Sequence, residues 1–335
     1  MLVKELVSLA APSGFEDEVR DFLRKNALCD EIYTDSIGNL ICHKKGEGKR
    51  VMIAAHMDEV GFIITGITDD GFLKFRPLGS IETMVMLSNK VYIGKNRIPG
   101  IIGAKAVHLQ TAEEMKTSLK VKDMYIDIGA AGKEDAEKIV SLGDYAVFES
   151  EYKEFGDNLV KSRALDDRVG CAILLELMKN EYESDMYFTF TVQEEVGLRG
   201  AQVAAYSIKP DIALVIEGTT CSDVYGSKPH TTVTTLGGGA VMTAMDSGAV
   251  SNKEYYDFIM QIAEKNNIPL QIKRTTMGGT DAGRIQTSGN GVKTAVLAVA
   301  CRYIHSSVSV MNKDDFENVY KLALNVLQNI ERSNL

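Results

Sequence analysis

Apolar residues in this chain follow two periodicities, and the dominant one changes twice along the sequence. Near the N-terminus a short helical pattern ends at Pro12-Ser13-Gly14, and a second amphipathic helix carries Val19, Phe22 and Leu23 on one face. Strand-like segments follow. The last of them, VMIAAH, is apolar at almost every position, as a strand covered on both faces would be. This part of the chain predicts strands and helices packed in layers.

From residue 64 to residue 158 the apolar segments become shorter and strand-like. They are separated by Gly, Asp and Asn turns, and one short helix is expected around residues 133–141. The strand-like segments are FLKF, MVML, KVYIG, GIIG, MYIDI and YAVF. The pattern predicts a small β-barrel or sandwich that interrupts a larger domain.

From residue 159 long helical patterns alternate with apolar strands again. Helices are expected over residues 167–179, 251–266 and 312–330, and Ser251 and Glu254 have the spacing of a capping box. The strands between them are MYFTFTV, IALVI and AVLAVACRYI. We therefore expect an α/β fold with a discontinuous main domain, residues 1–63 and 159–335, and a β-rich insert, residues 64–158.

Four apolar strands are each followed by side chains of the kind that bind metal ions. In open α/β sheets, ligands bind outside the carboxyl ends of the strands, so these side chains are expected to converge on one cleft. His56 and Asp58 follow VMIAA, Glu194 and Glu195 follow MYFTFTVQ, Glu217 follows IALVI, and His305 follows AVLAVACRYI.

Each of these signals also has an ordinary structural explanation. A His-x-Asp sequence is common by chance, although a carboxylate two residues after His56 is able to orient the imidazole. Asp166 and Asp167 open a helix, where both could act as simple caps. The functional alternative is that one of them bridges two metal ions while the other caps the helix.

The remaining candidates leave similar alternatives open. Glu194 and Glu195 form either a surface turn or a pair in which one binds metal and the other accepts a proton. A lone histidine such as His305 is often structural. Taken together, however, two histidines, three carboxylates and an additional Glu suit a pair of zinc or cobalt ions about 3.5–4 Å apart.

Composition excludes several classes of protein. There are 37 Lys and Arg against 46 Asp and Glu, a formal charge of −9, which disfavours nucleic acid and anionic membrane as partners. The longest apolar run, residues 295–301, is too short for a bilayer, and the N-terminus lacks a secretory pattern, so a cytoplasmic protein is expected. Five widely spaced cysteines without a CxxC predict free thiols.

Six segments together resemble the glutamyl aminopeptidase and tetrahedral (TET) aminopeptidase family, in order and over nearly the whole chain. They are AAHMDEVGF, RALDDRVG, VQEEVGLRGA, VIEGT, GGTDA and RYIHS. The resemblance implies a phosphorylase/hydrolase-like α/β catalytic domain, with a mixed sheet flanked by helices, and a β-rich insert that mediates dimerisation. It also implies a homo-oligomer, from a dimer to a dodecamer.

The resemblance further implies two divalent metal ions per subunit, most often Zn2+, with Co2+ as the second choice. One ion would be bound by His56 and Glu217, and family members often carry Asp at the position of Glu217. The other ion would be bound by Glu195 and His305. Asp166 would bridge the two ions, and the peptide bond that follows it would be cis.

The implied activity is removal of N-terminal amino acids from peptides. A water shared by the metal ions would attack the first peptide bond, with Glu194 as general base and Asp58 orienting the metal-binding histidine. Gly279, Thr280 and Asp281 either shape the pocket for the substrate side chain or simply make a turn.

Two further histidines are weaker site candidates, and three other functions are alternatives to the aminopeptidase. His230 is a weak candidate for lining the cleft, and His108 for reaching a neighbouring subunit's site. A glycoside hydrolase of the endoglucanase kind would also use two carboxylates, but sugar sites usually carry stacking aromatics and this chain has no Trp. A metal-dependent deacetylase or amidase would share the ligands without requiring a free N-terminal amine. A non-catalytic protein would have no need to retain the base together with all the ligands.

Overall fold

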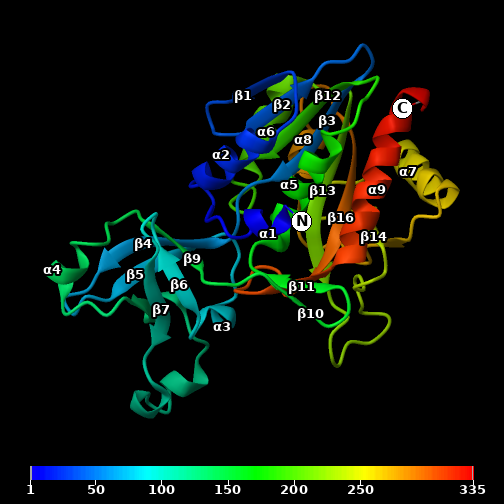
Figure 1. Ribbon diagram of the computed structural model, residues 1–335. Coiled ribbons are helices and arrows are strands. Elements are labelled where there is room, and N and C mark those ends of the chain that lie inside the picture. Colours follow the sequence, from blue (N-terminus) through cyan, green and yellow to red (C-terminus); the bar gives the residue numbers. More distant parts are fainter. Residues whose placement is uncertain (1, 334) are drawn as a thin grey trace.

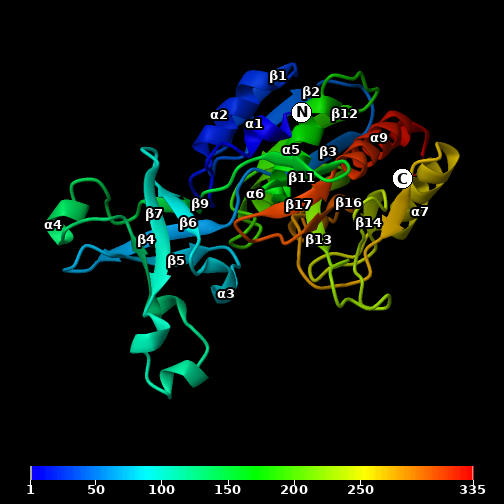
Figure 2. The same cartoon turned by 60° about the horizontal axis from the view of Figure 1, so that its bottom comes forward.

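The structure, a computed structural model, describes residues 2–333 and 335. An 11-stranded mixed sheet carries helices on both of its faces, and a closed barrel of six strands projects to one side of it (Figure 1). The same separation is visible after a rotation of the molecule (Figure 2). The α/β fold with a barrel-like insert, expected from the sequence pattern, is confirmed.

The large sheet is parallel at its centre and antiparallel towards its edges. Strands follow the order β1-β2-β12-β3-β13-β16-β17-β11-β10, while β14 pairs with β16 and β15 pairs with β14. The neighbours β12, β3, β13 and β16 all run parallel. The strands are β1 (Glu31–Thr34), β2 (Leu40–Lys44), β3 (Arg50–His56), β10 (Lys153–Phe155), β11 (Leu159–Ser162), β12 (Asp185–Thr191), β13 (Ile212–Cys221), β14 (Ala240–Thr243), β15 (Leu270–Ile272), β16 (Lys293–Arg302) and β17 (Ser309–Asn312).

The central strands are buried on both faces, which is why their sequences are almost continuously apolar. In β3, Val51 and Ile53 pack into the core on one face, and Met52 and Ala54 pack into the core on the other. The first core also receives helices α1 (Val3–Leu6), α2 (Asp17–Asn26), α5 (Leu165–Leu177), α7 (Lys253–Lys265) and α9 (Lys313–Asn329). The second receives α6 (Arg199–Ile208) and α8 (Ala282–Gln286).

The barrel has a hydrophobic core of its own. Phe62 lies edge-on to both Phe75 and Phe148, with ring centroids 5.1 Å apart in each pair. The strands pair in the order β4-β5-β8-β7-β6-β9. The 3-10 turn η4 (Ile330–Arg332) lies outside the barrel, after α9. The barrel elements are β4 (Gly61–Ile67), β5 (Leu73–Leu78), α3 (Thr83–Met86), β6 (Lys90–Ile93), β7 (Ile98–Ala104), η1 (Val107–Leu109), η2 (Glu114–Lys116), η3 (Val121–Asp123), β8 (Met124–Asp127), α4 (Lys133–Ala136) and β9 (Tyr145–Phe148).

Several local expectations differ from the structure. Residue 64 lies inside β4, and β10 belongs to the large sheet, so strand pairing places the barrel between residues 61 and 148 rather than 64 and 158. The helix expected over residues 133–141 is the single turn α4. The capping box at Ser251 is wrong: Asn252 caps α7 by accepting from the Tyr255 N–H, while the Ser251 hydroxyl donates to the Thr243 carbonyl.

The longest apolar run forms part of β16 at the centre of the sheet. Within the part of the chain that the structure describes, no helix combines the length and apolar character needed to cross a membrane. The five cysteines are free thiols, as expected, and only Cys29 is partly exposed.

Candidate metal centre

The carboxyl ends of the parallel strands bring the expected ligands to one edge of the sheet. His56 is the last residue of β3 and pairs in register with Thr191, so the turn after β12 carries Glu194 and Glu195 to the same place. His305 lies three residues beyond β16. The convergence predicted from the strand ends is therefore present.

Glu217 reaches this edge by a different route from the one expected. It lies within β13 rather than after it, because β13 stays paired with β16 as far as Cys221. The pairing of β13 with β3 ends earlier, at Val215 and Ala54. The Glu217 side chain therefore faces His56 beside the point where the two strands separate.

Five side chains form two groups that share Asp166. Asp166 Oδ1 lies 3.4 Å from His56 Nε2, and Glu217 Oε2 lies 3.6 Å from the same nitrogen. Asp166 Oδ2 lies 3.6 Å from His305 Nε2, and Glu195 Oε2 lies 3.3 Å from that nitrogen. Within each group, the possible ligand atoms lie within 4.8 Å of one another. The first group is His56, Asp166 and Glu217, and the second is Asp166, Glu195 and His305.

The hydrogen bonding of this cluster fits a bound cation. The four carboxylate–imidazole distances exceed the 2.7–3.2 Å of a direct N–H···O hydrogen bond. Asp166 Oδ1 and Glu217 Oε1 are buried and have no hydrogen-bond partner. A buried carboxylate oxygen without a partner is costly, and a divalent cation would satisfy it. Imidazole with carboxylate suits zinc and related ions.

The charge balance leads to the same conclusion. Burial raises the pKa of Glu195 to about 7 and that of Glu217 well above its ordinary value. Burial alone would raise the pKa of Asp166 as well, but the nearby imidazoles of His305 and His56 outweigh it and lower that pKa. Because three carboxylates share this small volume, a cation offsets a repulsion that otherwise favours protonation.

Glu194 stands at the same edge of the sheet. A carboxylate oxygen of Glu194 lies within 4.8 Å of ligand atoms of His56 and Glu195. Burial, aided by the charge of Glu195, raises the pKa of Glu194 well above its ordinary value. A carboxyl group of raised pKa at a hydrolytic centre suits proton transfer near neutral pH, and its position alone would also allow it to be a ligand.

The His56 ring is held mainly by a backbone group. Its Nδ1 lies 3.1 Å from the Asp58 carbonyl oxygen and 3.5 Å from the Asp58 carboxylate. Because a carbonyl only accepts, this contact favours a proton on Nδ1 and leaves Nε2 free to bind metal. The contact to the Asp58 carbonyl is therefore shorter than the contact to the Asp58 carboxylate, and the orienting role of that carboxylate stays a prediction.

The two adjacent aspartates have separate roles. The peptide bond between Asp166 and Asp167 is cis, as the family resemblance implies. Asp167 accepts from the Gly170 N–H at 3.0 Å, which caps α5, and from the His56 N–H at 3.2 Å. Asp166 faces the cluster instead. Of the alternatives left open by the sequence, the geometry favours one capping residue and one cluster residue.

The remaining sequence candidates lie outside the cluster. Among the three candidates for the side-chain pocket, Thr280 and Asp281 are buried and Gly279 is exposed. Asp281 accepts from the Thr191 hydroxyl at 2.5 Å, so it braces the end of β12. His108 and His230 are both exposed, and neither belongs to any of the groups of side chains that could hold a metal ion.

Other buried polar residues around the cluster carried no sequence signal strong enough to single them out. Ser13, Glu16 and Glu59 are each at most 4% exposed, and each bonds to a segment that carries cluster residues. The sequence Pro12-Ser13-Gly14 indicated a turn, but nothing in it indicated that Ser13 bonds to Asp58, 45 residues away.

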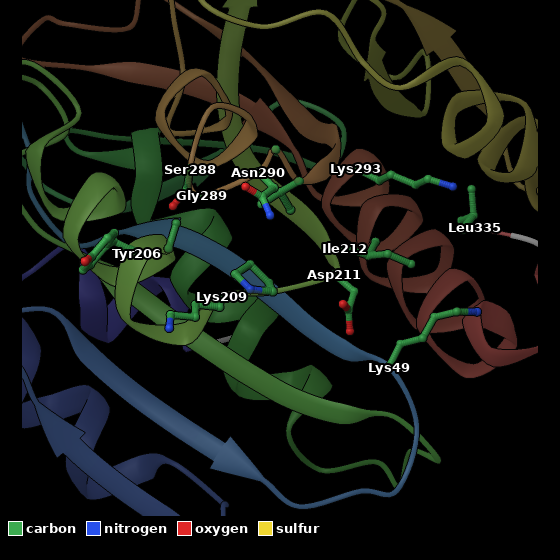
Figure 3. A pocket seen from close by; sticks show the side chains of 14 residues that line it. Lys49, Tyr206, Lys209, Asp211, Ile212, Ser288, Gly289, Asn290, Lys293 and Leu335 are labelled. Carbon is green, nitrogen blue, oxygen red and sulfur yellow. The ribbon is translucent and has the colours of Figure 1, made fainter.

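Two cavities lie at opposite ends of the central strands. A cavity of about 10 Å³ lies beside Asp166, Glu195 and His305. A cavity of about 890 Å³ lies at the amino ends of β3, β13 and β16, where Lys49, Ile212 and Lys293 line it (Figure 3). The larger cavity includes none of the cluster residues, so size does not identify the reactive site here.

Comparison with known proteins agrees with this geometry. The M42 glutamyl aminopeptidase family model matches residues 38–322. A lysyl aminopeptidase of Pyrococcus furiosus is 32% identical over 98% of this chain and 97% of its own. A glutamyl aminopeptidase of Lactococcus lactis subsp. cremoris is 32% identical over 94% of this chain and 91% of its own.

Solved structures extend the likeness to the fold. A TET aminopeptidase from the marine sediment archaeon Thaumarchaeota archaeon SCGC AB-539-E09 superposes with a TM-score of 0.94 at 35% identity, covering 98% of this chain and 95% of that one. The TET1 peptidase of Pyrococcus horikoshii, described as assembling into a tetrahedron or a large octahedral shell, gives 0.87 at 35% identity, covering 97% and 98%. A structure described as an endoglucanase of Thermotoga maritima gives 0.83 at 33% identity, covering 99% and 98%.

The matched residues include all five members of the cluster as well as Glu194. Identity of about a third extends over nearly the full length of both aminopeptidase relatives. The chain belongs to the M42 glutamyl aminopeptidase family and is a peptide hydrolase.

Proposed function

We propose that this protein is an aminopeptidase that holds two divalent metal ions and uses Glu194 as its general base. The observation that carries the proposal is the position of Asp166. Its two oxygens face different histidines, His56 at 3.4 Å and His305 at 3.6 Å. A carboxylate placed in this way suits a bridge between two ions, as in other two-metal hydrolases.

Each proposed ligand has a definite place in this arrangement. His56 and Glu217 would hold one ion, Glu195 and His305 the other, and Asp166 both. When bound, the ions would supply Lewis-acid chemistry that makes a water molecule more acidic and a peptide carbonyl more electrophilic. Zn2+ suits this donor set best, and Co2+ is the alternative.

The proton transfers fall to Glu194. Its carboxylate accepts a proton from the attacking water as the water oxygen bonds to the carbonyl carbon of the first peptide bond. It then gives this proton to the leaving nitrogen as the C–N bond breaks. Burial and neighbouring charges raise its pKa, which allows both steps near neutral pH.

The substrate is a peptide with a free N-terminal amine. The match to the glutamyl aminopeptidase family and the lysyl and glutamyl aminopeptidase relatives support this substrate. The requirement for a free amine separates an aminopeptidase from a metal-dependent amidase or deacetylase.

Hydrolysis of chromogenic aminoacyl substrates tests the proposal. Free Leu, Glu, Lys and Gly derivatives would be compared with their N-acetylated forms, on chelator-treated protein and after addition of zinc or cobalt. We expect cleavage of the free forms only, restored by metal. Cleavage of the acetylated forms would favour an amidase. Cleavage of β-glucan, measured in parallel, with no aminoacyl cleavage would favour the endoglucanase function.

We further propose a homo-oligomer that assembles through the barrel domain. Six apolar side chains on the barrel and its loops are more than half exposed: Met84, Ile101, Val107, Leu109, Met115 and Leu142. Large apolar side chains exposed in this number suit an association surface. Light scattering after size-exclusion chromatography would give the assembly size, and a monomer would contradict the proposal. The cytoplasmic location stays a prediction from sequence.

A further inference from the structure

The turn that carries the proposed base is held through three consecutive backbone amides. The N–H groups of Gln193, Glu194 and Glu195 donate to carboxylates at 3.2, 3.0 and 3.2 Å. The first donates to Glu16 Oε1, the second to Asp58 Oδ1 and the third to Asp58 Oδ2. Hydrogen bonds to a charged acceptor such as the Asp58 carboxylate are the stronger kind, and all three bonds fix the main chain on which Glu194 stands.

The Asp58 carboxylate is fixed in turn by the N-terminal segment. The Ser13 hydroxyl donates to Asp58 Oδ2 at 2.6 Å, in a site where Ser13 is 4% exposed and Asp58 fully buried. The shortest hydrogen bonds of this carboxylate therefore go to the base turn and to Ser13, and its distance to the His56 imidazole is longer, at 3.5 Å.

Glu16 closes the arrangement from the same segment. Its Oε1 accepts from the Gly14 N–H at 2.7 Å as well as from Gln193, and its side chain is buried. Gln193 has a φ of 55°, in the left-handed region, where a residue other than glycine needs support from its surroundings. Glu16 supplies that support one residue before Glu194.

The N-terminal segment is itself fixed to the start of the barrel. Pro12 and Glu59 form a parallel bridge, the Ser13 N–H donates to the Glu59 carbonyl, and the Glu59 N–H donates to the Ala11 carbonyl. Residues 11–16 are therefore a rigid support for the base turn and not a loose terminus.

We propose that Ser13 and Glu16 are positioning residues that hold the 193–195 turn, and with it the Glu194 carboxylate, at the cluster. This inference rests on the proposed function of Glu194. Proton transfer requires the base within hydrogen-bond reach of the water, and a displacement of about 1 Å can lower turnover by about 100-fold. Neither residue is a member of the metal-type groups. The turn also carries Glu195, but the other four proposed ligands lie on other segments, so metal binding should fall less than turnover.

The test compares Ser13→Ala and Glu16→Ala with matched controls elsewhere in the chain. Ser251→Ala removes a hydroxyl that also donates at 2.6 Å, in this case to the Thr243 carbonyl. Asp315→Ala also removes a buried carboxylate that accepts from two backbone amides, those of Gly237 and Gly239. Each protein would be measured for kcat, KM, metal content, melting temperature and amide hydrogen exchange over residues 188–198.

We expect Ser13→Ala and Glu16→Ala to lower kcat by about 10- to 100-fold, with KM nearly unchanged and metal content falling much less than kcat. On metal-free protein they should also speed exchange in the 188–198 segment. The controls should keep kcat within about twofold and leave that exchange unchanged, whatever they do to the melting temperature. Ser13→Thr, which keeps the hydroxyl, should restore most of the kcat.

Three outcomes would overturn the proposal. In the first, kcat of both variants matches the controls, and exchange over residues 188–198 is unchanged. In the second, kcat falls only in proportion to lost metal, which would mean that Ser13 and Glu16 keep the metal ligands in place and do not position the base. In the third, Glu194→Gln in the same assay keeps full turnover, which would overturn the proposed base as well. An inactive Glu194→Gln beside fully active Ser13→Ala and Glu16→Ala would overturn the positioning role alone.

Discussion

Glu59 and Arg163 form a buried ion pair beside the place where the chain enters the barrel. Glu59 lies two residues before β4, and Arg163 directly follows β11. The Arg163 guanidinium donates to Glu59 Oε2, and Arg168 Nη2 donates to Glu59 Oε1 at 3.0 Å. All three side chains are at most 6% exposed. Since Asp58 and Asp166 lie one and three residues from this pair, it connects the barrel crossing to the cluster.

Glu59→Gln should destabilise the protein strongly. The substitution removes the negative charge shared by two buried guanidinium groups, and breaking a buried pair by removing one partner costs about 3–5 kcal/mol. Urea unfolding of the metal-free protein would measure the change in the free energy of unfolding.

The matched control for this change is Asp257→Asn. Asp257 pairs with Lys253 on the exposed face of α7, where both side chains are more than 40% exposed. Its loss should cost no more than about 1 kcal/mol. Equal effects of the two substitutions would mean that the Glu59 pair contributes no more than a surface pair.

Glu194→Gln should separate catalysis from metal binding. The amide keeps the size of the side chain but cannot accept and return a proton, so turnover should fall by about 100- to 10,000-fold. Metal content per chain should stay at the wild-type value. Elemental analysis and aminoacyl hydrolysis on the same preparation would measure both, with Glu195→Gln as the variant expected to lose metal. Metal loss in Glu194→Gln equal to that in Glu195→Gln would make Glu194 a ligand.

Asp166→Asn should lose both metal ions, whereas Glu217→Gln should lose mainly one. The reason is that the Asp166 oxygens face both histidines, while Glu217 faces only His56. Titration of chelator-treated protein with zinc, followed by calorimetry, would count the sites. Two sites of near wild-type affinity in Asp166→Asn would contradict the bridge.

Asp315 should make stability depend on pH in the acid range. Burial raises its pKa to about 6 from an ordinary value of 3.8. Between about pH 4 and pH 6 the folded protein therefore retains a proton that the unfolded chain has lost, so this contribution to stability is present at the lower pH and disappears as pH rises.

The measurement compares metal-free wild type with Asp315→Asn by urea unfolding across this range. The free energy of unfolding of wild type should fall relative to that of the variant as pH rises from about 4 to about 6, and the difference should stay constant above about 7. A difference that is flat throughout, or that changes in the opposite direction, would show that the pKa of Asp315 is not raised in the folded protein.

Local pattern was sufficient for the main features of this protein. The apolar run VMIAAH predicted a strand covered on both faces, and in the structure β3 packs into cores on both sides. The stripe over residues 312–330 predicted the buried face of α9. His56, Glu194, Glu195 and His305 were found because parallel strands end at a common edge, which is a rule of the fold and needs no knowledge of distances.

The tertiary structure decided the contacts between residues far apart in sequence. The place of Glu217 depends on β13 staying paired with β16. The support of the turn that carries Glu194 depends on two hydrogen bonds between distant residues. Ser13 bonds to Asp58 across 45 residues, and Glu16 bonds to Gln193 across 177. Periodicity reports only whether a residue faces the core or solvent. A buried hydrogen bond instead requires two particular atoms within about 3 Å, and that is fixed only when the whole chain has packed.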